Sequence, residues 1–517
     1  MHAKRAGDLF DLIVIGGGTA GLVAAAGAAS LGARSILIER QRLGGECLWT
    51  GCVPSKALIG SARIADALRR TAEFGLSSSE VDAPASEIGA PASELSGRSP
   101  GTGPFGSAVL ASVRETRARV QPHDDPSRFR KLGVEVLEGT AARLVSPVRV
   151  EAGNRILEGR RILIATGSRP AIPPVEGLAE AGCYTHETAF EDESLPRSVV
   201  VLGAGAIGVE FAQAYCRLGV DVTMVELAGR ILPNEDAEVA AQLESLLRRE
   251  GIRIHVGHAA ISAERSNGES VLHLKSMNPA SSDVSVELAD AAVTVRAERI
   301  FVAAGRLSNV EGLGLEAAGV DVGRDGIAVD GMLRTSRRHI YAAGDVTGGL
   351  RFTHVADHEA RTVVRNALFP LAARVDYSVV PWAVFSDPPL ARVGLTEAEA
   401  RERHGDAVRV YRYDTSDLDR VITDRETGGM VKLITDRRGR LLGGHVLAPS
   451  ADTMIMEVAL AIRHRLRIAD LSRLVHPYPT MSEGIRRAAD MYYRSKLTDR
   501  SRRWLDRYFR ATRQFSA

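Results

Sequence analysis

The 517-residue sequence has little of what marks small secreted, membrane-spanning or polyanion-binding proteins. Four cysteines are too few to form a structural disulfide framework in a chain of this length. The longest apolar runs, such as Leu12–Ile15 and Val199–Leu202, fall far short of the ~20 residues that cross a bilayer. The 66 basic and 64 acidic residues leave a net charge of only +2, which argues against bulk binding of a polyanion.

The N-terminal residues lack the apolar core and cleavage site of a secretory signal, so we expect a cytoplasmic protein. In a reducing compartment, any bond between two cysteines is then expected to be catalytic or redox-sensing. Lysine is also scarce, because 60 of the 66 basic residues are arginine. A lysine that persists against this bias is a candidate for a chemical role. The lysines are Lys4, Lys56, Lys131, Lys275, Lys432 and Lys496.

Two segments have the pattern of a strand, a glycine-rich turn and a helix. One strand at residues 11–15 runs into GGGTAG at 16–21, and another at 198–202 runs into GAGAIG at 203–208. In each copy an acid, Glu39 or Glu226, follows the first glycine by 23 residues. Such glycines let the backbone approach a pyrophosphate at a helix N-terminus, and the acid binds ribose hydroxyls. Two dinucleotide sites are predicted, with two unrelated glycine-rich turns as the alternative.

The remaining chain divides into segments of different character. Residues 76–106 are rich in Ser, Gly and Pro and are predicted to form a flexible insertion. Short apolar strands are expected at 162–167, 301–305 and 340–345, and the last brings Asp345 to a strand's carboxyl end, where α/β sheets bind ligands. From about Val379 onward, strands at 430–435 and 441–447 precede a helix at 452–465. This last part predicts an α+β domain without a dinucleotide fingerprint.

The segment GGECLWTGCVPSK at residues 44–56 places Cys47 and Cys52 five residues apart. On a regular helix their Cα atoms would lie about 8 Å or more apart, whereas a disulfide needs less than ~7 Å. A distorted turn is therefore expected, which the glycine before Cys52 and the proline after it allow. A zinc half-site and two unrelated buried thiols are the alternatives. Cys183 and Cys216 lack such a context and are interpreted as core cysteines.

Together these motifs resemble those of the flavoprotein pyridine-nucleotide disulfide oxidoreductases, the family of dihydrolipoamide dehydrogenase, glutathione reductase and mercuric reductase. The resemblance covers nearly the whole chain apart from 76–106 and the tail after about Lys496. It implies an α/β fold with two Rossmann-like dinucleotide-binding domains, for FAD and NAD(P)H, and a C-terminal α+β dimerisation domain. The expected boundaries are 1–185 and 311–375 for the FAD-binding domain, 186–310 for the NAD(P)-binding domain, 376–495 for the dimerisation domain and 496–517 for a basic amphipathic tail.

The same resemblance implies the roles of single residues. Cys52 is expected to be the charge-transfer thiolate against the flavin, and Cys47 the thiol that attacks substrate. Lys56, one helical turn after Cys52, is expected beside the flavin in an ion pair with Glu210, and a surface lysine is the alternative. The expected FAD contacts are Gly16, Gly18, Gly21, Glu39, Lys56, Thr166, Gly167, Ser168, Asp345 and His354. The expected NAD contacts are Gly203, Gly205, Gly208, Glu226 and Gly305.

The nicotinamide cofactor is expected to be NADH. Glu226 ends the strand where a carboxylate binds the ribose diol and repels a 2′-phosphate. Arg230 nearby is the argument for NADPH.

The segment HPYPTMSE at residues 476–483 resembles the acid–base segment that disulfide-reducing members of the family supply from the partner subunit. Alignment on Glu483 and the proline and threonine before it places Tyr478 where those members have histidine. His476 lies two residues upstream, where lipoamide dehydrogenases often carry a histidine that is not the base. The segment resembles that of mercuric reductases, so Tyr478 and Glu483 are expected at the catalytic site.

These observations predict a homodimeric, mercuric reductase-like flavoprotein that uses FAD and NAD(P)H to reduce a metal ion or small oxidised acceptor. No resident metal and no nucleic-acid partner are expected. The chain departs from mercuric reductases, which carry a C-terminal vicinal cysteine pair, because no cysteine follows Cys216. Dihydrolipoamide dehydrogenase is the second hypothesis, which Glu226 supports and Tyr478 opposes. The third is a redox-linked flavoprotein that docks on a membrane or partner.

The third hypothesis comes from the C-terminal tail. From Tyr493 the tail combines many basic residues with Trp504, Leu505, Tyr508 and Phe509 at helical spacing. A basic amphipathic helix can lie on anionic lipid or bind a partner. A helix packed on its own dimer is the alternative.

Overall fold

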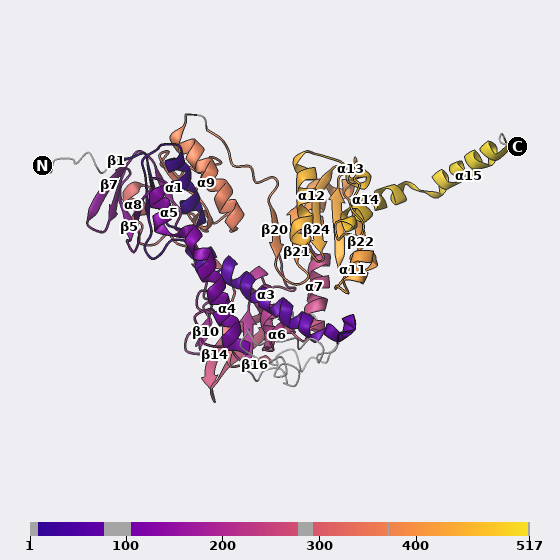
Figure 1. Cartoon of the computed structure of the whole chain (residues 1–517), viewed down its shortest axis with the longest axis horizontal. Coiled ribbons are helices and arrows are strands. Elements are labelled where there is room, and N and C mark those ends of the chain that lie inside the picture. The colour runs from indigo at the N-terminus through magenta and orange to yellow at the C-terminus, as the bar shows by residue number, and fades with distance from the viewer. Residues whose placement is uncertain (1–8, 77–104, 278–292, 371, 515–517) are drawn as a thin grey trace. The chain divides into compact units, whose positions relative to one another are not determined.

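The computed structural model describes residues 9–76, 105–277, 293–370 and 372–514 (Figure 1). The chain divides into two compact units. Unit 1 comprises Met1–Arg69, Ser78–Leu227 and Ile252–Asp376, and unit 2 comprises Arg70–Ser77, Ala228–Gly251 and Tyr377–Ala517. The insertion expected at 76–106 lies almost entirely outside the described residues.

The first sheet of unit 1 has five parallel strands, and the side chains on its two faces pack into two hydrophobic cores. Its order is β19 (Ile340–Ala342), β8 (Ile162–Ile164), β2 (Leu12–Ile15), β3 (Ser35–Ile38) and β4 (Glu135–Leu137). Val14 and Leu37 point to the face covered by α1 (Thr19–Ser30) and α9 (Thr353–Leu368). Ile13 and Ile36 point to the other face and pack with Leu144. This alternation is the two-residue period of strands, and burial of both faces explains the continuous apolar runs.

Several smaller elements complete this half of unit 1. A four-stranded sheet, ordered β1 (Leu9–Phe10), β7 (Arg155–Gly159), β6 (Arg149–Ala152) and β5 (Ala142–Ser146), contributes to the second core. The helical part consists of α2 (Gly45–Trp49), α3 (Cys52–Arg69), α4 (Phe105–Val120) and α5 (Pro126–Lys131).

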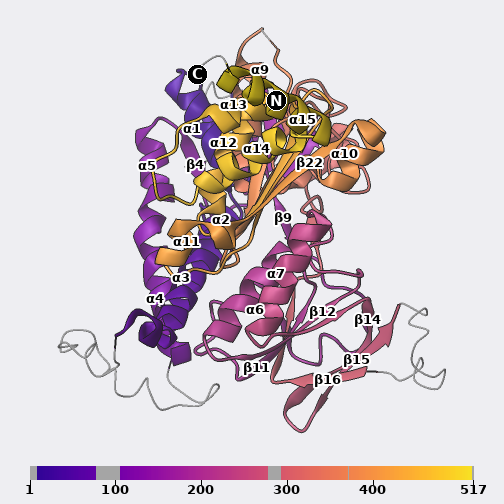
Figure 2. The same ribbon diagram turned by 90° about the vertical axis from the view of Figure 1, so that its right-hand side faces the viewer.

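The second Rossmann-like sheet of unit 1 is also parallel. Its order is β10 (Cys183–Tyr184), β17 (Arg299–Val302), β11 (Ser198–Leu202), β12 (Asp221–Glu226) and β13 (Arg253–Val256), and α6 (Ala206–Arg217) lies against it (Figure 2). An antiparallel sheet of β14 (His258–Ser266), β15 (Glu269–Ser276) and β16 (Val293–Ala297) covers the other side of its core. The two predicted strand–turn–helix units are thus confirmed as β2–α1 and β11–α6.

The part of unit 2 from Tyr377 onward has the α+β character that the sequence predicts there. Its antiparallel sheet has the order β20 (Pro381–Val384), β21 (Leu390–Gly394), β24 (Leu441–Leu447), β23 (Met430–Thr435) and β22 (Arg409–Asp414). One face packs on α12 (Ala451–Arg463), α13 (Ile468–Arg473) and α14 (Glu483–Lys496). The other elements include α7 (Ala237–Arg249), α10 (Glu397–His404), α11 (Asp419–Thr423) and the terminal α15 (Asp499–Gln514). The expected amphipathic tail is therefore a helix that begins after a break at Leu497 and Thr498.

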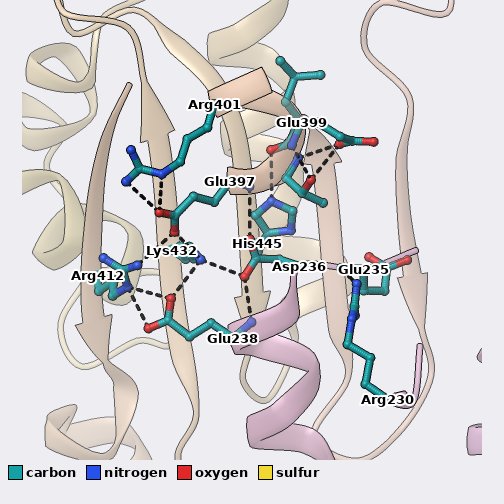
Figure 3. A network of polar contacts seen from close by, with 12 residues as sticks. Arg230, Glu235, Asp236, Glu238, Glu397, Glu399, Arg401, Arg412, Lys432 and His445 are labelled. Atoms are coloured by element: carbon teal, nitrogen blue, oxygen red, sulfur yellow. Dashed lines mark hydrogen bonds and ion pairs between the residues drawn. The ribbon is translucent and has the colours of Figure 1, made fainter. Parts of the chain in front are cut away.

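The second face of this sheet carries a buried polar network around Lys432 (Figure 3). The Lys432 ammonium lies 2.8 Å from a carboxylate oxygen of each of three acids, Asp236, Glu238 and Glu397. Arg412 lies 2.7 Å from Glu238 and 3.0 Å from Glu397. Since Asp236 caps α7 by accepting a hydrogen bond from Glu238 N, the network fastens α7 to the sheet.

Among the helices of the described residues, none combines the length and the apolar character needed to cross a bilayer.

Candidate active site

The turn between Cys47 and Cys52, called the redox turn below, joins two separate helices. Cys47 lies in α2, Cys52 is the first residue of α3, and Thr50 between them leaves the helical conformation with φ −140°. The backbone N–H of Gly51 closes the turn by donating to the carbonyl of Glu46 at 2.6 Å. The predicted distortion is confirmed. Both cysteines are free thiols in this structure, with Cys47 half-buried and Cys52 exposed.

A threonine hydroxyl bridges the two sulfurs, which the sequence did not indicate. Thr353 Oγ1 lies 2.6 Å from Cys47 Sγ and 3.3 Å from Cys52 Sγ. Thr353 is the first residue of α9, so the N-terminus of this helix is directed at the thiol pair. The partial positive charge of a helix N-terminus favours a thiolate nearby. His354, an expected FAD contact, follows it and stacks on Phe352 with ring centroids 5.3 Å apart.

The two thiols differ in acidity. The hydrogen bond with Cys47 is the main reason that the pKa of Cys52 falls to about 6, and Thr353 and the charge of Lys56 lower it further, while burial opposes the change. The same bond, together with burial, raises the pKa of Cys47 well above its ordinary value. The pair therefore shares one proton near neutral pH. Cys52 is the thiolate and Cys47 keeps the proton.

The expected ion pair beside the redox turn is present. Lys56 Nζ lies 2.9 Å from Glu210 Oε2, between α3 and α6, and the side chains are 37% and 8% exposed. Because Lys56 follows Cys52 by four residues in α3, its ammonium lies on the same face of the helix as the thiol. The pair is half-buried rather than deeply buried.

A second charged cluster is formed by Glu46, the residue before Cys47, with Arg306 and His186. Glu46 receives hydrogen bonds from Arg306, one of them 2.7 Å long, and its Oε1 lies 2.7 Å from His186 Nε2. Burial alone would raise the pKa of the Glu46 carboxyl, but the bonds with His186 and Arg306 lower it to about 2. Glu46 is therefore a permanent anion next to the expected attacking thiol. The sequence analysis missed this cluster, although a carboxylate adjacent to a reactive cysteine is a signal that could have been used.

Arg306 links this cluster to residues expected to bind FAD. Its Nε donates to Ser168 Oγ at 2.8 Å, and the Ser168 hydroxyl donates to Asp345 at 2.5 Å. Thr166, a third expected contact, donates to the carbonyl of Asn309 at 2.7 Å. Ser168 and Arg306 lie close together because their strands, β9 (Ser168–Pro170) and β18 (Arg306–Ser308), pair with each other.

The first glycine fingerprint has the geometry of a dinucleotide cradle. A Cβ on Gly21 would lie 1.8 Å from the carbonyl oxygen of Gly16, so close helix–strand packing requires glycine there. A Cβ on Gly18, by contrast, would meet nothing nearer than 3.9 Å, which leaves the N-terminus of α1 open to a pyrophosphate. Glu39 accepts from Gly17 N at 2.6 Å and so stands at the turn. These residues fit the adenosine diphosphate part of FAD.

The second fingerprint repeats this geometry. A Cβ on Gly208 would lie 2.0 Å from the oxygen of Gly203, whereas one on Gly205 would meet nothing within 4 Å. Glu226 accepts from Ala204 N at 2.6 Å, as Glu39 does in the first copy. Gly305 ends the neighbouring strand region with φ +131°, which a side chain would strain. These residues fit NAD(P)H.

The expected acid–base residues belong to unit 2. The Tyr478 hydroxyl is exposed and donates to Asp419 at 2.5 Å, and this bond raises the pKa of Tyr478 above its ordinary value. Glu483 is buried at the start of α14 and pairs with Arg486 at 2.9 Å. His476 is held by Glu457 at 3.1 Å. Within the described residues of one subunit, Asp419 is thus the side chain that holds the Tyr478 hydroxyl.

Two family models match the chain. The model described as pyridine nucleotide-disulphide oxidoreductase matches residues 10–360. The dimerisation domain of the same family matches residues 380–489.

Known proteins resemble the chain over nearly its whole length. Dihydrolipoyl dehydrogenase of Bacillus subtilis is 33% identical over 487 residues, with 93% of this chain and 97% of that protein covered. Mercuric reductase of Streptomyces lividans is 34% identical over 492 residues, with 93% and 96% covered. Among solved structures, the Cu(II) complex of the HOCl-induced flavoprotein disulfide reductase RclA from Escherichia coli has a TM-score of 0.77 and 26% identity, with 93% of this chain and 99% of that chain covered.

The family models, the relatives and the paired thiols agree with each other. Two dinucleotide cradles and two neighbouring thiols are what FAD, NAD(P)H and disulfide chemistry require. The chain therefore belongs to the pyridine nucleotide-disulphide oxidoreductases, a family of flavoprotein enzymes that use FAD and NAD(P)H.

Proposed function

We propose that this chain is an NADH-dependent flavoprotein reductase whose Cys47–Cys52 pair delivers electrons to a soft metal ion or a small oxidised acceptor rather than to lipoamide. The proposal assigns the catalytic roles to Cys47, Cys52, Lys56 and Glu210 of one subunit. Tyr478 and Glu483 are assigned to the same site from the partner subunit, as in the family resemblance. The domain boundaries expected from the sequence are kept as part of this proposal.

The observation that carries the proposal is the state of Tyr478. A dithiol substrate must lose protons when it reduces a disulfide, and a general base with a pKa near the operating pH serves that step best. The bond to Asp419 raises the pKa of the Tyr478 phenol, which is already near 10 in an unperturbed tyrosine. A phenol of this kind donates a hydrogen bond instead of taking a proton. Such a phenol suits an electron acceptor that is bound by a ligand or a hydrogen-bond donor and needs no general base.

The dithiol chemistry follows from the acidities described above. Bound FAD supplies the two-electron relay between NADH and the disulfide. Cys52 is held as the thiolate by Cys47, Thr353 and Lys56, and Cys47 keeps the proton until an electrophile arrives. Soft, electrophilic metal ions and oxidants react with such thiols without a base. The Cu(II) complex reported for the similar RclA supports a metal ion as one acceptor.

The preference for NADH is supported by two side chains. The Glu226 carboxylate stands at the turn of the second fingerprint, where it would bind a ribose diol and repel a phosphate. Arg230, the argument for NADPH, already donates to the carbonyls of its own loop: to Leu232 at 2.9 Å, to Pro233 at 2.5 Å and to Glu235 at 3.0 Å. The Arg230 guanidinium is thus already hydrogen-bonded within its own loop. We expect kcat/KM to be higher with NADH than with NADPH.

The decisive experiment is an anaerobic NADH titration of the holoenzyme followed by an acceptor panel of lipoamide, glutathione disulfide, Hg(II), Cu(II) and quinones. Since general base catalysis contributes about 10²–10⁴-fold, dihydrolipoamide turnover should be lower by roughly that factor than in a lipoamide dehydrogenase. Tyr478→His should raise turnover with lipoamide or glutathione disulfide, and Tyr478→Phe should impair reduction of the physiological acceptor.

His476→Gln is the matched control, because this histidine lies two residues away and pairs with Glu457. It should leave the acceptor preference unchanged. Dihydrolipoamide turnover by the unmodified enzyme at hundreds per second would instead assign the chain to the dihydrolipoamide dehydrogenases.

A further inference from the structure

The terminal helix α15 lies beyond residues 380–489 that match the dimerisation domain, and it has two opposed faces. Trp504, Leu505, Tyr508 and Phe509 recur at helical spacing and form one apolar stripe. Trp504 stacks on Tyr508 with ring centroids 5.8 Å apart, and Tyr508 contacts Phe509 at 5.5 Å. Trp504, Tyr508 and Phe509 are nevertheless 64%, 51% and 49% exposed. About half or more of each of these three side chains is therefore exposed in the described chain, although the rings contact each other.

The opposite face is strongly basic. The helix carries two acids, Asp499 and Asp506, and six arginines, Arg500, Arg502, Arg503, Arg507, Arg510 and Arg513. Its net charge of +4 exceeds the +2 of the entire chain, so the rest of the protein is slightly acidic. Within the described residues, the ion pair found on this helix is Arg510 with Asp506, at 2.7 Å.

An anionic lipid surface matches both faces of α15 at once. At 1.5 Å per residue the helix is about 24 Å long, so it presents a continuous stripe parallel to a surface. Tryptophan, tyrosine and phenylalanine favour the headgroup boundary, where an apolar ring and a polar tip are both solvated. Arginine stems extend along such a surface and place their charges at the phosphates. A strong amphipathic pattern with low mean hydropathy is typical of helices that lie in the plane of the interface.

We propose that α15 is a peripheral membrane-binding helix that anchors this flavoprotein to anionic phospholipid surfaces. The contact is electrostatic first, through the arginine face, and then apolar, through the four-residue stripe. It is independent of the acceptor chemistry and does not require the proposed function to be correct.

The test uses full-length holoenzyme and vesicles of phosphatidylcholine alone or with phosphatidylglycerol added. The protein is expected to co-sediment with the anionic vesicles, not with the neutral ones, and to be released when salt is raised. The variant R502Q/R503Q/R507Q should weaken this binding on the order of 100-fold. The variant W504S/F509S should also lose binding, while NADH oxidation stays unchanged in both.

R437Q/R438Q/R440Q is the charge-matched control, because these three arginines are exposed in the hairpin between β23 and β24. It should bind vesicles as the unmodified protein does. Binding that is absent, or equal on neutral and anionic vesicles, overturns the proposal. A dimer that dissociates when residues 498–517 are removed, without any vesicle binding by the full chain, would show that the stripe packs on a second copy instead.

Discussion

Lys56 and Lys432 of this arginine-rich chain form ion pairs at 2.8–2.9 Å, in two very different surroundings. Lys56 pairs with Glu210 beside the thiols and is 37% exposed. Lys432 is 2% exposed and contacts three carboxylates in unit 2 (Figure 3). A half-exposed charge can act on a neighbouring group, whereas a fully buried and saturated charge can only hold its partners in place. A lysine in this arginine-rich chain therefore indicates a position that needs a compact cation, and that position need not be a catalytic one.

The largest expected effect separates these two roles by stability. Lys432→Met leaves three carboxylates around an apolar side chain, and loss of one partner from a buried network costs about 3–5 kcal/mol. Denaturant unfolding of the holoenzyme should show a loss of that size, while the pKa of Cys52 stays unchanged. Lys131→Met, at an exposed position, is the control. A loss below about 1 kcal/mol would mean that the network is not a stability element.

The same network predicts how stability responds to acid. His445 is buried beside Lys432, and burial lowers its pKa from 6.5 to about 4. The folded state then binds this proton less readily than the unfolded state, so stability falls as pH drops from about 6.5 to about 4. The loss is on the order of 3 kcal/mol if this histidine acts alone. Unfolding curves of His445→Gln should lack this part of the decline, whereas His404→Gln, at an exposed position of α10, should keep it.

Lys56 should matter for reactivity more than for stability. Because the pair with Glu210 is half-exposed, Lys56→Met should cost about 1–2 kcal/mol of stability or less. It should raise the pKa of Cys52 above about 6, since a positive charge that favours the thiolate is gone. Alkylation of the reduced enzyme across pH measures this pKa, and rapid mixing with NADH should show slower flavin reduction. Identical profiles for variant and unmodified enzyme would count against a role for Lys56 at the site.

The smallest expected effect concerns the Glu46 anion, which precedes Cys47 in the chain. The charge of Glu46 raises the pKa of both thiols, so Glu46→Gln should lower the pKa of Cys52 modestly below about 6. Arg306→Met should have the opposite sign, because it leaves the Glu46 anion without its guanidinium partner. Glu269→Gln, at an exposed strand start, is the matched control. Shifts of the same sign in the two variants would indicate general damage to the turn.

Local sequence patterns predicted the elements that depend on local preferences. The strands at Ser198–Leu202, Met430–Thr435 and Leu441–Leu447 have the expected bounds, because each is a buried apolar run with turn residues at its ends. The break between Cys47 and Cys52 followed from helix geometry together with the distance that a disulfide between them would require. The Lys56–Glu210 pair came from the family resemblance, since 154 residues separate the two side chains.

Long-range contacts set the limit of the sequence analysis. Thr353 meets Cys47 across 306 residues, and Arg306 meets Glu46 across 260. No periodicity or motif marks Thr353, because a hydroxyl at a helix start is most often a cap. The three carboxylates around Lys432 could not be predicted either. Glu238 lies in α7, Asp236 directly before it and Glu397 in α10, and no local sequence pattern links these elements to β23.

The position of α7 restricts how this enzyme can be recombined with its relatives. Asp236 and Glu238 lie within the sequence of the expected NAD(P)-binding domain, but their cationic partner Lys432 lies in unit 2. A chimera that exchanges residues 186–310 as one block would separate these acids from the lysine that they contact. Functional crossover points are therefore expected near residues 227 and 252, so that the donor segment excludes α7 and the recipient keeps its own.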